Sequence, residues 1–115
     1  IIWGELGPCG ARGCCSAMVY WNPRITLGLW ELLRGKQWGD LNTALEPVRA
    51  LHRFLAEHFG PLGFTDTAYD HLCGVATGFL PMPLRSQAPY RSATEADVEA
   101  LRAWCKKHFP ELLEL

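Results

Sequence analysis

An apolar stripe at helical spacing fills the middle of the chain. Between residues 40 and 59, apolar residues recur every three or four positions, which is the period of one helix face. Asp40 can cap this helix, and Gly60-Pro61 ends it. Pro47 should kink the helix without abolishing it, because the stripe continues in phase on both sides. The pattern predicts one long helix that buries its apolar face, formed by Leu41, Leu45, Val48, Leu51, Leu55 and Phe59.

A second helix is predicted over residues 23–34. Asn22 is a favourable N-cap residue, and Pro23 stands at the first helical position, where its missing N–H costs nothing. Gly35 stops this helix. The apolar residues that follow the cap at helical spacing are Leu27, Trp30 and Leu33.

Two further helices are predicted in the second half of the chain. One runs from residue 65 or 66 to Ala76 and is closed by Gly78. The other starts after Thr94, which forms a capping-box pattern with Asp97. Between them, the prolines of residues 81–85 require an extended connector. The apolar face of the last helix consists of Val98, Leu101, Trp104, Cys105 and Phe109.

Two segments near the start lack the helical period. Residues 1–3 form a brief apolar run that ends at Gly4, and residues 13–19 contain small and apolar residues without polar alternation. Both patterns suit parallel strands that are covered on both faces. The predicted order is therefore strand, strand, three helices, extended connector and helix, which is an α/β chain.

The segment Gly10-Ala11-Arg12-Gly13-Cys14-Cys15-Ser16 resembles the Gly-x-x-Gly-x-x-Ser segment in the eighth barrel strand of the dihydrodipicolinate synthase and N-acetylneuraminate lyase family. Later landmarks follow in family order. Asn22-Pro23 resembles the opening of the eighth helix, and residues 32–36 with Ala44 look like the following helix hairpin. Residues 80–84 are similar to the family's connector, and residues 97–102 to its last helix. The resemblance covers nearly the whole chain.

The resemblance implies the C-terminal portion of a TIM (β/α)8 barrel followed by a C-terminal helical subdomain. Residues 1–36 would hold the last strands and the eighth helix, and residues 37–115 the helical subdomain. A complete barrel needs roughly 250 residues, so 115 residues would be only part of one. Two departures stand out: Gly4 and Gly10 leave no room for the seventh helix between them, and Leu80 stands where the family carries Arg, with Arg85 following later.

The chemistry that the resemblance implies is Schiff-base catalysis on pyruvate, which needs no cofactor. A lysine amine condenses with the ketone, and the imine then acts as an electron sink. That lysine belongs to an upstream strand, so the catalytic residue is expected outside this segment. Lys36 lies beside a helix terminus, and Lys106 and Lys107 lie in the last turn of a helix, so all three are poor candidates.

The favoured function is a lyase that cleaves a substituted 2-oxo acid to pyruvate and an aldehyde, by retro-aldol or hydratase-aldolase chemistry. The 2-oxo acid can be aryl-substituted. A dihydrodipicolinate synthase or a 2-keto-3-deoxy-sugar-acid aldolase or dehydratase shares the mechanism and stays open. An alternative of another class is a non-catalytic helical module that binds a partner through the stripe of its long helix.

Barrel active sites lie at the C-terminal ends of the strands. The candidate substrate-binding residues are therefore Trp3, Gly4, Glu5, Cys15 and Ser16. In the family, a main-chain carbonyl at the position of Cys15 faces the reacting centre. A packed thiol at Cys15 and a solvated rim carboxylate at Glu5 are the structural alternatives. Trp21 can join Trp3 in lining a pocket, whereas the other three tryptophans suit a core or a subunit contact.

Composition excludes several classes of function. A net charge of -1 and a charged fraction of 20% give no basic patch for nucleic acid or a membrane surface. No signal sequence or membrane-length apolar run occurs. Five cysteines without a Cys-x-x-Cys and four scattered histidines predict no metal site and reduced thiols in the cytoplasm. The resembled family is usually tetrameric or dimeric, which implies a homo-oligomer.

Overall fold

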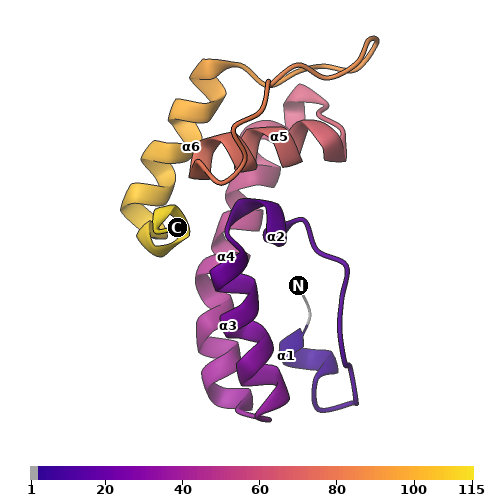
Figure 1. The fold of residues 1–115 in the computed structure, drawn as a ribbon, viewed down its shortest axis with the longest axis vertical. Helices are drawn as coiled ribbons and strands as arrows, with labels where there is room; N and C mark the ends of the chain where they lie inside the picture. Colours follow the sequence, from indigo (N-terminus) through magenta and orange to yellow (C-terminus); the bar gives the residue numbers. More distant parts are fainter. Residues whose placement is uncertain (1–2) are drawn as a thin grey trace.

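The computed structural model describes residues 3–115, and every regular element in that range is a helix. Figure 1 shows the arrangement. The α-helices are α1 (Trp3–Leu6), α2 (Met18–Trp21), α3 (Pro23–Arg34), α4 (Trp38–Phe59), α5 (Asp66–Thr77) and α6 (Glu95–His108). Two short 3-10 helices complete the set, namely η1 (Gly60–Leu62) and η2 (Pro110–Leu113).

The predicted strands, and with them the portion of a TIM barrel, are wrong. Trp3 opens the helical turn α1, while Ile1 and Ile2 lie outside the described residues. Residues 11–16 are irregular, with Cys14 and Cys15 exposed, and residues 18–21 are helical. A short apolar run does not by itself distinguish a strand from a buried helix. A parallel strand also needs a neighbouring strand for its hydrogen bonds, and residues 3–115 contain none.

The helices α3 and α4 form an antiparallel hairpin along the long axis of the molecule (Figure 1). The predicted start of α3 is confirmed, because the Oδ1 of Asn22 accepts a hydrogen bond from the N–H of Arg24 at 3.0 Å. Helix α4 begins at Trp38 and not after Asp40. Asp40 instead occupies the first turn of α4, where a carboxylate interacts favourably with the helix dipole.

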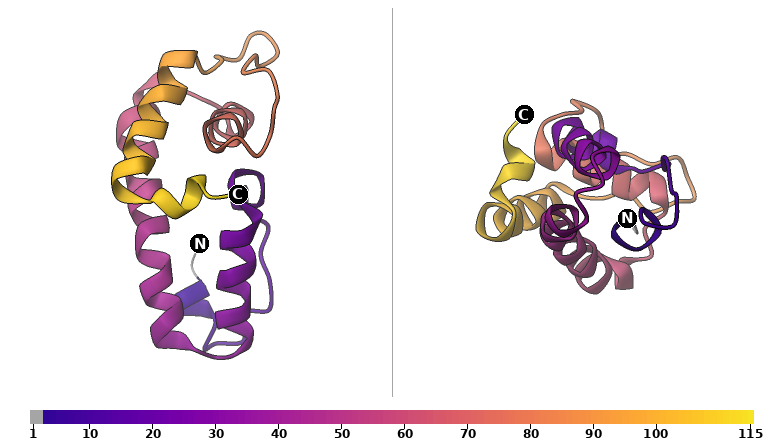
Figure 2. Two further views of the ribbon diagram at one scale, coloured as in Figure 1. Left: turned by 60° about the vertical axis from the view of Figure 1, so that its left-hand side comes forward. Right: turned by 90° about the horizontal axis from the view of Figure 1, so that it is seen from below.

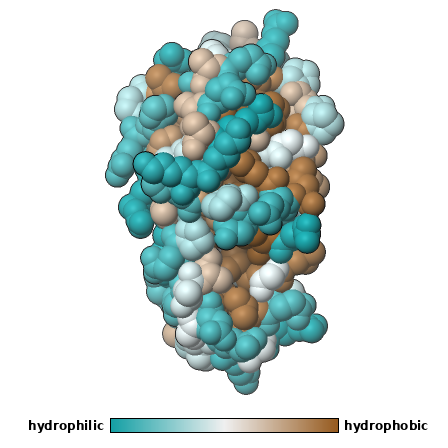
Figure 3. Space-filling model, turned by 90° about the vertical axis from the view of Figure 1, so that its left-hand side faces the viewer, coloured by the Kyte–Doolittle hydropathy of each residue, from teal (hydrophilic) through white to brown (hydrophobic). Residues whose placement is uncertain are grey.

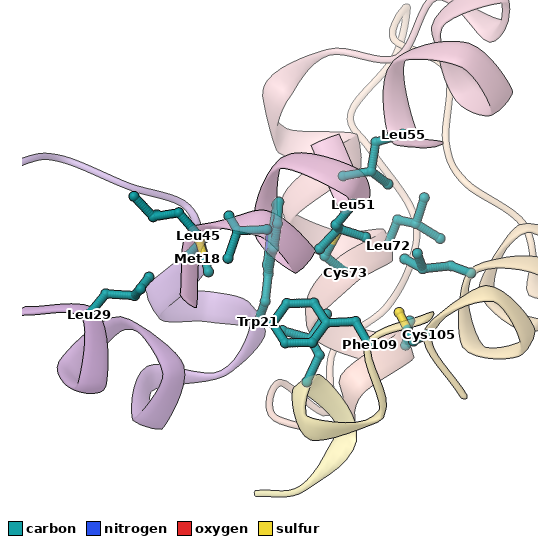
Figure 4. Close-up of a cluster of buried hydrophobic side chains, with 14 of the residues drawn as sticks. Met18, Trp21, Leu29, Leu45, Leu51, Leu55, Leu72, Cys73, Cys105 and Phe109 are labelled. Carbon is teal, nitrogen blue, oxygen red and sulfur yellow. The ribbon is translucent and has the colours of Figure 1, made fainter. Parts of the chain in front are cut away.

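The predicted stripe of α4 is confirmed, since all six of its residues are buried. Figure 4 shows Leu45, Leu51 and Leu55 in a cluster with side chains from the other helices. Trp21 of α2 and Phe109 at the end of α6 belong to the same core. On α3 the prediction is wrong in one respect: Leu27 is 62% exposed, and Leu29 packs inward with Leu33.

Helix α5 begins at Asp66, one of the two predicted starts, and ends at Thr77, one residue beyond the predicted Ala76; helix α6 begins after Thr94 as predicted. Gly78 adopts a left-handed conformation, with φ of 82°, and ends α5. Thr94 and Asp97 form the capping box of α6. The connector between the two helices contains no regular element. Figure 2 shows η2 turning back from α6 toward α2, so that the end of the chain lies beside the start of α3.

Within residues 3–115, none of the helices is both long enough and apolar enough to cross a membrane.

Candidate functional site

Two surface hollows meet at residues 15–17. The larger, which we call the Tyr69 groove, has a volume of about 630 Å³. The smaller, the Trp3 hollow, has a volume of about 440 Å³. Both are lined by Cys15, Ser16, Ala17 and His52. The groove adds Tyr20, Trp21, Leu55, Ala56, Asp66, Tyr69 and Asp70, and the hollow adds Trp3, Leu6, Ala11, Gly13 and Cys14.

Two hydrogen bonds hold residues 13–16, which include part of the lining that the two hollows share. At one end, the indole Nε1 of Trp3 donates to the carbonyl oxygen of Gly13 at 3.5 Å. At the other end, the Oγ of Ser16 accepts a hydrogen bond from the N–H of Met18 at 3.3 Å. The bond from Met18 satisfies a free N–H at the start of α2. The segment therefore links α1 to α2 without regular structure of its own.

His52 reaches the segment from α4. Its imidazole packs edge-on against the indole of Trp21, with 5.7 Å between the ring centroids and 79° between the ring planes. Burial lowers the pKa of His52 below its ordinary value of 6.5. A neutral imidazole is consequently the main form at pH 7, and it presents one donor and one acceptor.

Trp21 lies beneath the Tyr69 groove and is only 4% exposed. Its indole Nε1 is buried and has no hydrogen-bond partner among the described residues. A buried N–H without an acceptor costs about 1–3 kcal/mol. The unpaired indole N–H of Trp21 therefore destabilises the core beneath the groove.

Helix α5 supplies the charge of the groove through Asp66 and Asp70. The two carboxylates stand one helical turn apart on α5, where like charges repel each other. Burial raises the pKa of Asp70, and the negative charge of Asp66 raises it further. Tyr69 lies between them in sequence, and burial raises the pKa of its phenol as well. Neither carboxylate takes part in the salt bridges found within residues 3–115.

The candidate residues from the sequence fall into two groups. Trp3, Cys15 and Ser16 come together around the Trp3 hollow. Gly4 and Glu5 line neither hollow. Gly4 is buried against Asn42 of α4, whose side chain a Cβ at that position would overlap. The carboxylate of Glu5 pairs with the guanidinium of Arg49, with 3.7 Å between Oε1 and Nη2.

Sequence reasoning missed Tyr20, His52, Tyr69 and the two aspartates. The spacing of Asp66 and Asp70 on a predicted helix does place them on one face. Nothing local indicates that α2 and α4 meet that face, because the meeting depends on tertiary packing. Trp21 was a pocket candidate from sequence, and it does line the groove.

All three lysines of the chain are exposed, and none of them lines the Tyr69 groove or the Trp3 hollow. No group of three or more His, Cys, Asp or Glu in residues 3–115 is arranged to hold a metal ion. The thiol of Cys14 has its pKa raised by burial and by Cys15, which disfavours its nucleophilic thiolate form.

Comparison of the chain with protein-family models, with curated proteins and with solved structures finds no match. Over residues 3–115, the fold and the site define an all-helical domain with an open groove that is aromatic and acidic.

Proposed function

We propose that the chain contributes a substrate-binding wall to a pyruvate-dependent lyase whose Schiff-base lysine lies outside these 115 residues. The observation that carries the proposal is the gathering of Trp3, Cys15 and Ser16 around one hollow. The resemblance to the dihydrodipicolinate synthase and N-acetylneuraminate lyase family led us to expect that these three residues bind substrate. The start of α3 at Pro23 and the position of residues 97–102 within α6 also agree with landmarks that resemble that family.

The Trp3 hollow suits the carboxylate of a 2-oxo acid. Its lining contains no acidic side chain that would repel the anion. The backbone N–H groups of residues 12–16 have no acceptor within residues 3–115. Successive N–H groups bind an anion where the backbone turns them toward one point, and a carboxylate accepts stronger hydrogen bonds than a neutral oxygen does. The N–H groups of Cys15 and Ser16 would orient pyruvate in this way.

The lysines of this chain do not suit the covalent step. A Schiff-base lysine needs a lowered pKa, which a buried or cationic environment provides. Lys36, Lys106 and Lys107 are all exposed. Lys36 follows the end of α3 with a positive φ of 55°, and the other two lie in the last turn of α6.

Borohydride reduction in the presence of labelled pyruvate tests the proposal. We expect no adduct with the 115-residue chain alone. A longer natural polypeptide that contains this chain should be labelled at one lysine outside residues 1–115. Omission of pyruvate and the variant Lys36→Arg serve as controls, and labelling should vanish in the first and persist in the second. A longer polypeptide that forms no adduct contradicts the proposal.

The substrate is a 2-oxo acid, and we favour an aryl-substituted one that is cleaved to pyruvate and an aldehyde. Dihydrodipicolinate synthesis and cleavage of a 2-keto-3-deoxy-sugar acid are the alternatives with the same mechanism. A panel containing a semialdehyde, a sugar acid and an aryl aldehyde separates them. We further propose a homo-oligomer in the cytosol, where the free thiols stay reduced.

A second candidate is a non-catalytic helical module that binds a protein partner. Figure 3 shows apolar surface gathered in a band on one face of the molecule, and large apolar patches often mark interaction sites. The stripe of α4 is buried and cannot serve this role, but Leu27 of α3 is 62% exposed. A module of this kind folds alone with one cooperative thermal transition. A chain that melts without a cooperative transition contradicts it and favours the lyase segment.

A further inference from the structure

We propose that Cys14 and Cys15 form a reversible redox site, in which a small-molecule disulfide such as oxidised glutathione converts the two thiols into one disulfide. Both cysteines are free and exposed, and both line the Trp3 hollow. The inference does not depend on the lyase proposal, because it concerns thiol exchange and requires no 2-oxo acid.

The backbone around the two cysteines can accept the geometry of such a bond. Cα atoms of adjacent residues are about 3.8 Å apart, which is shorter than the separation of about 4.4–6.8 Å that is usual in disulfides. The peptide unit between the two residues must therefore twist when the bond forms. Residues 11–16 contain no regular element, and the backbone N–H groups of Cys14 and Cys15 have no acceptor within residues 3–115. A twist there breaks no helix or strand.

The same strain makes the bond reversible. Strained or exposed disulfides are reduced more easily than structural ones, and they are the labile class in proteins. A bond between adjacent exposed cysteines is both strained and exposed. Glutathione can therefore reduce it as well as form it. The other thiols have no comparable partner: Cys9 lines neither hollow, and Cys73 and Cys105 are buried.

The exchange proceeds in two steps. The thiolate of Cys15 attacks one sulfur of oxidised glutathione, forms a mixed disulfide and releases one glutathione thiolate. The thiolate of Cys14 then attacks the sulfur of Cys15 and releases the second glutathione. Two protein thiols are thereby oxidised to one disulfide, and one glutathione disulfide is reduced to two thiols.

The electrostatics of the pair favour this order. Burial raises the pKa of Cys14, and the negative charge of Cys15 raises it further. The second contribution exists only while Cys15 is a thiolate. Once Cys15 is neutral in the mixed disulfide, Cys14 ionises more readily and can complete the exchange.

The site is linked to the packing of α1. The carbonyl oxygen of Gly13, directly before Cys14, accepts a hydrogen bond from the Nε1 of Trp3 at 3.5 Å. Trp3 is buried, and its ring packs against that of Trp30 with 6.2 Å between the centroids. Because the twist arises next to this bond, closure of the disulfide should change the environment of the Trp3 indole.

Equilibration of the folded chain with mixtures of reduced and oxidised glutathione tests the proposal. After acid quenching and denaturing alkylation with N-ethylmaleimide, mass spectrometry of the peptides identifies the state of each cysteine. We expect the peptide that contains Cys14 and Cys15 to lose two hydrogen atoms and to carry neither maleimide nor glutathione. Cys73 and Cys105 should be alkylated. Dithiothreitol should reverse the change.

Variants and NMR locate the bond and its effect. Cys14→Ser and Cys15→Ser should each lose the internal disulfide and stop at a glutathione adduct, whereas Cys9→Ser should form the disulfide as the parent chain does. In the Cys9→Ser background, oxidation should move the indole N–H signal of Trp3, which the variant Trp3→Phe assigns. The signal should stay in place when Cys14 and Cys15 are also replaced by Ser.

Three outcomes overturn the proposal. The first is a chain whose Cys14 and Cys15 remain thiols or stable glutathione adducts at every glutathione ratio. The second is a disulfide that joins Cys9 to either residue or links two chains. The third is a Trp3 signal that oxidation leaves unmoved, which would separate the thiols from the packing of α1. Circular dichroism checks that each variant keeps its helices.

Discussion

The amide nitrogen Nδ2 of Asn22 donates a hydrogen bond to the carbonyl oxygen of Leu112, 90 positions further along the chain, at 3.1 Å. The same nitrogen lies 2.9 Å from the carbonyl oxygen of Glu114, and Asn22 is fully buried. Its Oδ1 meanwhile caps α3. One side chain therefore joins the start of α3 to the last turn of the chain.

Replacing this amide by a carboxylate should be costly. In Asn22→Asp, the oxygen that caps α3 is kept, but the donor becomes an acceptor that faces carbonyl oxygens in a buried site. We expect the free energy of unfolding to fall by about 3–4 kcal/mol. Urea denaturation measures it. Asn42→Asp, a partly buried amide that donates to Trp38 beside Arg49, should lose far less. Equal losses in the two variants would contradict this role for Asn22.

Arg102 of α6 binds the C-terminal end of α5. Its Nε donates to the carbonyl oxygen of Ala76 and its Nη2 to that of Val75, both at 2.9 Å. Arg102→Lys cannot make both bonds and should lower the free energy of unfolding by about 1–2 kcal/mol. Glu99→Gln is the control, because it removes only the exposed ion pair with Arg102, worth about 0.5 kcal/mol. A loss as large in Glu99→Gln would assign the effect to the ion pair.

The five thiols should divide by reactivity. Cys9, Cys14 and Cys15 are exposed, whereas Cys73 and Cys105 are buried. Burial raises the pKa of Cys105 to about 11 and that of Cys73 well above its ordinary value. At pH 8 we expect a disulfide reagent to modify three thiols of the folded chain, and all five after denaturation. Rapid modification of five thiols without denaturant would show that α5 and α6 do not pack as described.

The stability of the chain should fall in mild acid because of His52. Its pKa in the folded chain lies below 6.5, so the unfolded chain binds the proton more readily. Stabilisation by the neutral imidazole is therefore complete above pH 6.5 and is lost as the pH falls through the folded pKa. His52→Gln should reduce the difference in urea midpoint between pH 7.5 and pH 5. An unchanged difference in His52→Gln would contradict the assignment.

Local signals predicted the long helices well. Asn22-Pro23, Gly78 and the Thr94–Asp97 capping box satisfy backbone groups through neighbours in sequence, so their effects can be read from sequence. Residues 13–19 carried no such signal. Met18 belongs to a helical turn that buries it in the core, and a run of apolar residues cannot reveal which neighbours will cover it.

Some residues of the candidate site could likewise be predicted from the sequence, and others could not. Trp3, Cys15 and Ser16 were selected from a resemblance, and they lie around one hollow because α1 packs against α4 and Trp3 bonds to the carbonyl oxygen of Gly13, which the resemblance did not include. His52 and Tyr69 were not selected, because their helices meet residues 15–17 only in the folded chain. Glu5 was selected for its charge, but Arg49 of α4 engages it.

The hydrogen bonds of Asn22 also constrain the order of events during synthesis. A ribosome adds about 5–20 residues per second, so the partners of Asn22, 90 residues later, emerge about 5–20 s after it. Until then the Asn22 amide lacks these carbonyl partners. The contact between the start of α3 and η2 can therefore form only after the residues of η2 have been synthesised.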